Sequence, residues 1–173
     1  FGARGVTDLI YAVGIAPQKL AEVSRLRSLG ADIKIILDSA EAARAVSAFC
    51  RREKTTIPVL LEIDVDGPRS GIRPDGAELL PAAAALADGA ELVGVLTHAG
   101  DSYECKSTAE IEAAAEAERA GIVLATERLR AAGHTVKIVS AGSTPTLMFA
   151  KDEKTQYTLR DHWHDIVTDR RYV

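Results

Sequence analysis

The sequence has little of what marks membrane, secreted or nucleic-acid-binding proteins. Only 5% of its 173 residues are aromatic, and acidic residues outnumber basic ones, which gives a formal net charge of -4. Because no basic run creates a positive field, we expect no nucleic-acid partner. No hydrophobic run approaches the roughly 20 residues that a membrane-spanning helix needs, and no basic segment followed by a hydrophobic core marks an export signal, so we expect no membrane partner.

Cysteine is also scarce. The two cysteines, Cys50 and Cys105, form no Cys-x-x-Cys motif and are too few for a disulfide framework. This usage is typical of a reducing compartment, and we expect a cytoplasmic protein. With 47% hydrophobic and 27% charged residues, the composition is ordinary for a globular domain with a sizeable core.

What the sequence does contain is a repeated alternation of short hydrophobic runs and longer, alanine-rich amphipathic stretches. The runs are almost continuously apolar, as is typical of strands covered on both faces of a parallel sheet. They lie at residues 8–13, 33–37, 59–63, 92–96 and 136–139, with room for a sixth at 147–150. Helices are predicted at residues 17–29, 38–52, 77–87 and 107–132, the second and fourth beginning with the capping-box pairs Asp38/Glu41 and Ser107/Glu110.

Five or six βα units are too few for a whole barrel. A complete (β/α)8 barrel takes about 250 residues, so we predict an α/β fold that is a partial (β/α) TIM-type barrel over residues 1–150. Residues 151–173 are more charged and show no strand pattern, which indicates a divergent C-terminal tail. His162 and His164 in this tail have a spacing that can serve one metal ion, but no further ligands accompany them, and a solvated tail is the favoured interpretation.

Polar residues gather where the predicted strands end. In parallel sheets this edge carries the active site. Asp38 is better explained as a helix cap than as a catalytic group. Glu62 and Asp64 alternate with apolar residues, so both could point into the barrel, and Arg69 could neutralise them in a structural ion pair or contact a cofactor instead.

Two further loops are the best candidates for chemistry. Residues 140–146, Ser-Ala-Gly-Ser-Thr-Pro-Thr, follow a predicted strand and offer hydroxyls and free backbone N–H groups, which suit either a phosphate or a plain turn. Residues 98–104 place His98 and Tyr103, two groups able to exchange protons, on a glycine-containing loop. A structural role for that histidine stays open.

Three segments in order resemble the D-threonine aldolase and D-serine dehydratase family: residues 62–71 (EIDVDGPRSG), 98–103 (HAGDSY) and 142–146 (GSTPT). The opening at residues 5–12 (GVTDLIYA) is also similar to the third-strand region of that family. The resemblance covers about residues 1–150. It implies a barrel of the alanine racemase N-terminal domain type, with pyridoxal phosphate at the carboxyl-terminal mouth and a small amino acid as substrate.

Roles follow from the resemblance position by position. Arg69 resembles the arginine that faces the pyridine nitrogen of the cofactor, where a permanent cation keeps that nitrogen unprotonated. His98 and Tyr103 resemble residues near the cofactor and substrate. The phosphate cradle of the family is matched by Gly142, Ser143 and Thr144.

The departures from the family are equally informative. Its lysine that forms the internal aldimine lies upstream of every matched segment, so Lys19, Lys34 and Lys137 do not take its place. Its divalent-metal ligands lie in a C-terminal domain that has no match after residue 150. We therefore expect neither a catalytic lysine nor a metal site in this sequence.

Three hypotheses follow from this comparison. The leading one is a fragment or truncated relative of a pyridoxal-phosphate-dependent lyase acting on D-3-hydroxy amino acids, with little turnover on its own. The second is a non-catalytic domain that binds pyridoxal phosphate or another phosphorylated ligand. The third is a structural half-barrel that assembles with another chain, since exposed sheet edges need cover; a homo-oligomer is the expected form.

Overall fold

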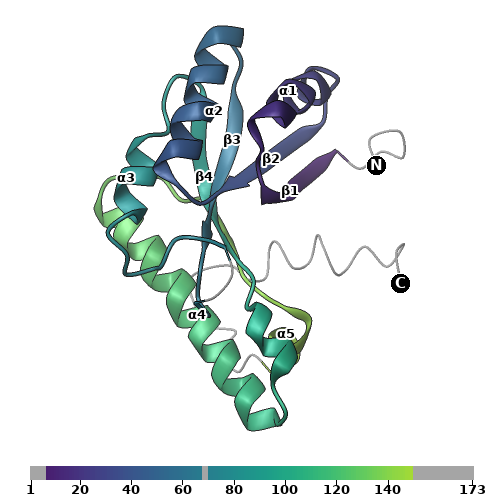
Figure 1. Cartoon of the computed structure of the whole chain (residues 1–173), viewed down its shortest axis with the longest axis vertical. Coiled ribbons are helices and arrows are strands. Elements are labelled where there is room, and N and C mark those ends of the chain that lie inside the picture. Colours follow the sequence, from purple (N-terminus) through teal and green to yellow (C-terminus); the bar gives the residue numbers. More distant parts are fainter. Residues whose placement is uncertain (1–6, 68–69, 150–173) are drawn as a thin grey trace.

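The computed structural model describes residues 7–67 and 70–149. Five parallel strands form one sheet in the order β1-β2-β3-β4-β5. They span Asp8–Gly14, Asp32–Leu37, Ile57–Ile63, Ala90–Thr97 and Ile138–Ser140. Because connections between neighbouring parallel strands are right-handed, a sheet whose strands follow chain order places its crossover helices on one side. The result is a curved half-barrel (Figure 1), which confirms the predicted α/β partial barrel.

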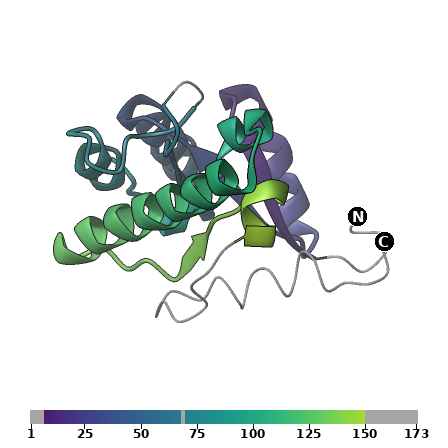
Figure 2. The same cartoon turned by 90° about the horizontal axis from the view of Figure 1, so that it is seen from below.

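The helices lie where the amphipathic stretches predicted them. A short 3-10 turn, η2 (Pro17–Lys19), leads into α1 (Leu20–Ser28), and the later crossovers contain α2 (Ala40–Glu53), α3 (Leu79–Ala84) and α4 (Thr108–Ala131). The 3-10 helix η3 (Gly100–Glu104) follows β4, and α5 (Thr144–Phe149) follows β5. The views in Figures 1 and 2 both show α5 against the N-terminal half of the long helix α4.

The two predicted helix caps had different outcomes. Ser107 caps α4 as predicted, because its side chain accepts a hydrogen bond from the backbone N–H of Glu110 at 3.3 Å. The cap predicted at Asp38 is wrong: Ser39 has the extended backbone of a cap and accepts from the N–H of Ala42 at 3.1 Å. Serine and aspartate are both strong capping residues, so the adjacent pair made the helix start ambiguous by one residue.

The sixth strand predicted at residues 147–150 is also wrong over the part that the structure describes. Residues 147–149 belong to α5, whose first helical hydrogen bond runs from the N–H of Leu147 to the carbonyl of Ser143 at 3.0 Å. Hydroxyl contacts between Ser143 and Thr146 close the turn that starts this helix. A short apolar run alone does not separate a strand from one helical turn.

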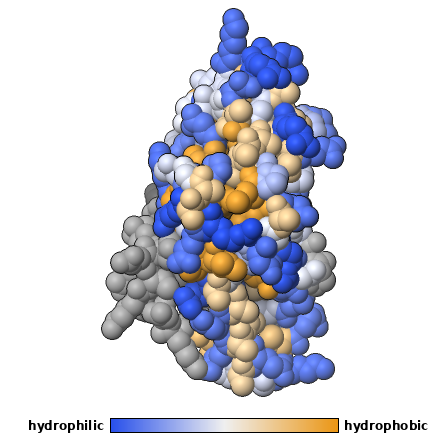
Figure 3. Space-filling view, turned by 90° about the vertical axis from the view of Figure 1, so that its left-hand side faces the viewer, coloured by the Kyte–Doolittle hydropathy of each residue, from blue (hydrophilic) through white to orange (hydrophobic). Residues whose placement is uncertain are grey.

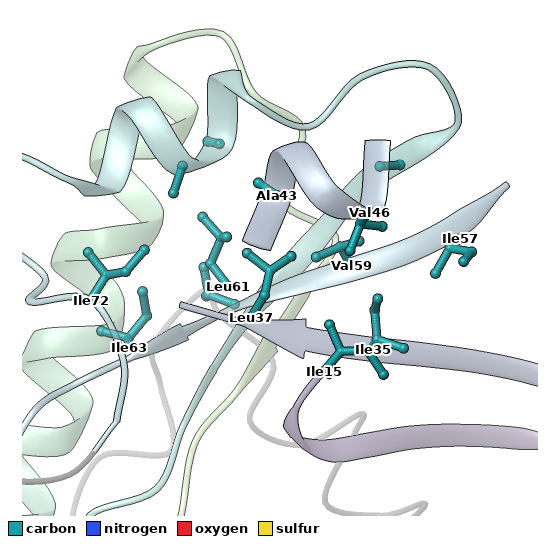
Figure 4. Packing of buried hydrophobic residues seen from close by; sticks show 14 of the residues in the cluster. Ile15, Ile35, Leu37, Ala43, Val46, Ile57, Val59, Leu61, Ile63 and Ile72 are labelled. Atoms are coloured by element: carbon teal, nitrogen blue, oxygen red, sulfur yellow. The ribbon is translucent and has the colours of Figure 1, made fainter. Parts of the chain in front are cut away.

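The core lies between the sheet and its helices. Ile35, Leu37, Val59 and Leu61 are almost fully buried and pack toward Val46 and its neighbours on α2 (Figure 4). Strand side chains alternate between faces, so Ile36 and Leu60, which are buried but lie outside this cluster, point to the inner face of the half-barrel. On the helical side, a band of hydrophobic surface remains visible between hydrophilic patches (Figure 3).

Gly94 sets the spacing of the last two strands. It pairs in register with Leu60 on one side and Ile138 on the other. A Cβ at this position would collide with the backbone carbonyl of Ile138. The strand β5 can therefore approach β4 only because residue 94 has no side chain, and this approach brings the loops that follow β4 and β5 together.

Candidate functional site

The loops that follow β4 and β5 meet at the carboxyl-terminal edge of the sheet. His98 comes directly after β4, and its ring Nδ1 lies 3.1 Å from the carbonyl oxygen of Gly142 in the loop after β5. The hydroxyls of Ser102 and Ser143 lie 2.6 Å apart across the same junction. Five of the residues predicted for the site are thus brought together: His98, Tyr103, Gly142, Ser143 and Thr144.

A buried chain of hydroxyl groups holds this junction. Ser102 donates its single hydroxyl hydrogen to the carbonyl of Ala99 at 2.6 Å, so the hydrogen between the two serines comes from Ser143. The backbone N–H of Ser143 donates to the hydroxyl of Thr146 at 2.9 Å. Ser102, Ser143 and Thr146 are each only 2% exposed. The donors of Ser143 are therefore directed inward and shape the loop.

Glu118, on helix α4, joins both loops through one carboxylate. Its Oε1 accepts from the backbone N–H of Ala99 at 2.8 Å and from that of Gly142 at 3.1 Å. Its Oε2 accepts from the hydroxyl of Thr146 at 2.7 Å. The side chain is 3% exposed, and this burial raises the pKa of the Glu118 carboxyl above its ordinary value, while the three hydrogen bonds oppose the increase.

The sequence interpretation did not include Glu118, although a signal was present. The buried positions of α4 recur every three or four residues, at Ala115, Glu118, Ile122, Ala125 and Leu129. A carboxylate in the middle of an apolar helical stripe needs buried hydrogen-bond donors. Its position therefore indicated a partner inside the fold.

His98 and Tyr103 form the outer part of the site. A carbonyl can only accept, so the contact with Gly142 requires a hydrogen on Nδ1 of His98, and the neutral ring then leaves Nε2 as an acceptor. The rings of His98 and Tyr103 stack with centroids 5.8 Å apart. The Tyr103 side chain is 55% exposed, and its hydroxyl accepts a long hydrogen bond of 3.5 Å from the N–H of Thr144.

Thr144 is the exposed residue of the predicted phosphate loop. It begins α5, and the preceding Gly142 has a φ of 140°, a backbone conformation that favours glycine. A bond of 3.5 Å is at the long limit for a hydrogen bond, so little energy holds Thr144 and Tyr103 together. The N–H and hydroxyl of Thr144 and the phenol of Tyr103 are neutral polar groups that lie at one point of the rim.

The loop after β3 lies at the same edge of the sheet and contacts η3. Asp64 is buried and accepts from the N–H of Gly67 at 2.7 Å, so it stabilises the turn. Glu62 accepts from the hydroxyl of Ser70 at 2.8 Å. Asp66 accepts from the backbone N–H of Asp101 at 2.9 Å, which connects this loop to η3. Arg69, the predicted partner of the pyridine nitrogen, lies outside the described residues.

Comparison with known proteins identifies the family. The model of the alanine racemase N-terminal domain family matches residues 3–160. The chain belongs to this family. It is 49% identical over 152 residues to the D-threo-3-hydroxyaspartate dehydratase of Delftia sp. (strain HT23), covering 87% of this chain and 40% of that enzyme. A solved structure of that enzyme superposes with a TM-score of 0.85.

Two more distant relatives extend the picture. An uncharacterized protein of Mycobacterium tuberculosis is 34% identical over 142 residues, which are 80% of this chain and 80% of that protein. The D-threonine aldolase of Filomicrobium marinum is 25% identical with a TM-score of 0.71, over 86% of this chain and 40% of the aldolase. The chain thus spans about 40% of the length of the two enzymes, and the resemblance predicted from the three motifs is confirmed at the level of the family.

No lysine of the described strands takes the place of the family's aldimine lysine. Lys34 lies near the amino end of β2, opposite the rim, and bonds to Asp8 at 2.6 Å and Asp32 at 2.8 Å. Burial acts to lower the pKa of Lys34, but the two carboxylates outweigh it and raise that pKa. Lys19 and Lys137 are exposed residues outside the strands. A lysine held as a cation is a poor nucleophile.

Within residues 7–67 and 70–149, no group of three or more His, Cys, Asp or Glu side chains could hold a metal ion. The candidate ligands His162 and His164 lie outside these ranges. Across the same part of the chain, no helix combines the length and the hydropathy needed to cross a bilayer.

Proposed function

We propose that this chain forms the phosphate-binding half of the active site of a pyridoxal-phosphate-dependent lyase that acts on D-3-hydroxy amino acids. The observation that carries the proposal is the junction of the β4 and β5 loops, where His98, Tyr103 and Thr144 meet at the rim. The 49% identity to a dehydratase of a 3-hydroxy amino acid supports the substrate class.

Four residues of this chain would form the phosphate site. Thr144 and Tyr103 would donate hydrogen bonds to the phosphate through the N–H and hydroxyl of the first and the phenol of the second. Gly142 and Ser143 would hold the loop in the shape that exposes those donors, because their own polar groups bond inward. Neutral donors stabilise an anion without adding a titratable charge.

His98 and Arg69 would act on the other side of the cofactor. Nε2 of His98 can accept a proton from a substrate group, since Nδ1 is committed to Gly142. The guanidinium of Arg69 would face the pyridine nitrogen and keep it unprotonated. When bound, pyridoxal phosphate supplies a conjugated ring that stabilises negative charge at the Cα of an attached amino acid.

A binding and turnover experiment tests this proposal on the chain as it stands. We expect reversible binding of pyridoxal phosphate, measured by equilibrium dialysis, and little release of glycine or pyruvate from D-threonine or D-serine, because the resemblance places the aldimine lysine upstream of every segment matched in this chain. Rapid turnover by the chain alone would contradict the division of the active site between this chain and a lysine-bearing segment. Absence of any binding would contradict the phosphate site.

A second candidate is a domain that binds the cofactor without chemistry. It is favoured by the M. tuberculosis relative, because the matched region makes up 80% of that protein and only 40% of the dehydratase. The nucleotide sequence upstream of Phe1 distinguishes the two candidates. An in-frame segment with a strand ending in lysine supports the lyase, whereas a start codon preceded by only a short leader without such a strand supports the binding domain.

A further inference from the structure

Glu118 stands apart from the other residues of the site because of where it originates. It lies in the middle of α4, on the outer layer of the half-barrel, yet its carboxylate bonds to the loop after β4 and to the loop after β5. The same Oε1 atom accepts both backbone N–H groups. The separation of the two loops is therefore set by the reach of one side chain.

The two amide contacts of Glu118 hold His98 through its backbone neighbour Ala99 and through Gly142, the hydrogen-bond partner of its ring. Ala99, whose N–H bonds to Glu118, is the residue next to His98. Gly142 bonds to Glu118 through its N–H and accepts from the His98 ring through its carbonyl. The orientation of the Gly142 carbonyl, and with it the hydrogen on Nδ1, depends on how Gly142 is held.

The third contact connects Glu118 to the phosphate loop. Thr146 donates its hydroxyl hydrogen to Glu118 and uses the same oxygen to accept the N–H of Ser143. This arrangement closes the turn from which Thr144 emerges at the surface. A buried carboxylate is expensive unless several donors compensate it. Here two donors come from the loops after β4 and β5, and the third comes from the first turn of α5.

We propose that Glu118 is a positioning residue that sets both the tautomer of His98 and the placement of Thr144 for a phosphate ligand. This inference rests on the proposed function for the ligand, but the geometry of His98 is independent of it. Glu118 itself is enclosed behind the loops and acts through Gly142 and Thr146.

Three variants separate positioning from general stability. Glu118→Gln keeps the length and can still accept both amides through its carbonyl, while its amide group can donate to Thr146, whose hydroxyl can turn to the Ser143 carbonyl 3.2 Å away. Glu118→Asp keeps the charge but is one methylene shorter, so it cannot reach both loops. Thr126→Val is the matched control: Thr126 is fully buried on the same helix, and within the part of the chain that the structure describes its hydroxyl bonds only to the carbonyl of Ile122.

The first readout is the tautomer of His98, measured by 15N NMR of the imidazole in the absence of any cofactor. The wild type, Glu118→Gln and Thr126→Val should keep the hydrogen on Nδ1, and Glu118→Asp should show a mixture of both tautomers. The second readout is affinity for pyridoxal phosphate. Glu118→Asp should bind at least about tenfold more weakly, since supporting residues behind metal sites contribute roughly 10- to 100-fold.

The outcomes distinguish this inference from the proposed function. If neither the wild type nor any variant binds pyridoxal phosphate but the tautomer changes as expected, the proposed function fails and the role of Glu118 in positioning His98 stands. A folded Glu118→Asp with an unchanged tautomer and unchanged affinity would overturn the positioning role. If that variant does not fold, hydrogen exchange of the wild type provides the test. The amides of Ala99 and Gly142 should have similar protection factors, because both bond to the same carboxylate oxygen. Protection factors that differ by more than about tenfold, or roughly 1.4 kcal/mol, would overturn the positioning role.

Discussion

The Nδ1 atom of His98 lies 3.1 Å from the carbonyl oxygen of Gly142, and this contact joins the two loops that form the rim of the half-barrel. It leaves Nε2 of the neutral ring as the basic atom. The contact also makes the conformation of the β5 loop dependent on a residue that follows β4. Substitutions at His98 can therefore separate its structural role from its chemical one.

His98→Asn should preserve the fold and remove the basic atom. The asparagine amide can take the place of Nδ1 and donate to Gly142. His98→Leu removes this donor and should lower the free energy of unfolding by about 1–3 kcal/mol. The change for His98→Asn should be smaller. Urea unfolding of the three proteins measures the difference. Equal losses for both variants would show that the Gly142 contact contributes little to stability.

Glu118 predicts a particular dependence of stability on pH. Burial raises the pKa of its carboxyl above the ordinary value of 4.5. The contribution of this pKa shift to the free energy of unfolding is therefore complete below about pH 4.5 and is lost as the pH rises through the raised pKa. The free energy of unfolding of the wild type should therefore fall relative to Glu118→Gln across that interval. A difference between the two proteins that stays constant with pH would contradict the raised pKa.

Gly94 should be intolerant of a side chain. Gly94→Ala places a Cβ against the Ile138 carbonyl, which forces β5 away from β4 and should lower the free energy of unfolding by about 1–3 kcal/mol. Gly14→Ala is the control, because no atom of the described residues lies within 4 Å of its added Cβ. Denaturant midpoints compare the two, and equal midpoints would show that the β4–β5 spacing adapts freely.

Lys34 should resist modification by pyridoxal phosphate. Its amino group is held as a cation by Asp8 and Asp32 at the edge opposite the rim. After treatment with pyridoxal phosphate and borohydride, peptide mapping should show exposed lysines such as Lys19 and Lys137 modified well before Lys34. Preferential labelling of Lys34 would mean that the ion-pair cluster does not protect it.

The strands and the edge of the site could be predicted because burial on both faces leaves a direct mark on the sequence. The continuous apolar runs predicted all five strands in order, and the polar residues that follow the strands predicted the edge at which His98 and Gly142 lie. The cap of α4 at Ser107 was predicted from a local spacing that has few alternatives.

The features that could not be predicted depend on tertiary contacts. Asp38 and Ser39 are both good caps, and only the geometry of the chain leaving β2 selects Ser39. The helix α5 forms where a strand was expected, because it is stabilised by hydroxyl contacts and by packing on α4. The role of Glu118 requires that residues 99 and 142, far apart in the chain, come to one carboxylate.

A matched pair of charge substitutions tests most directly whether the rim at Thr144 binds the phosphate of the cofactor. Thr144 and Thr108 are both exposed threonines at the first residue of a helix, α5 and α4 respectively. Thr144→Glu places a carboxylate against the proposed phosphate, whereas Thr108→Glu places one at the start of α4, outside the residues proposed to hold the phosphate. Equilibrium dialysis should show pyridoxal phosphate affinity at least about tenfold weaker for Thr144→Glu, a difference of roughly 1.4 kcal/mol, and unchanged for Thr108→Glu. Equal affinities for the two variants would contradict phosphate binding at Thr144.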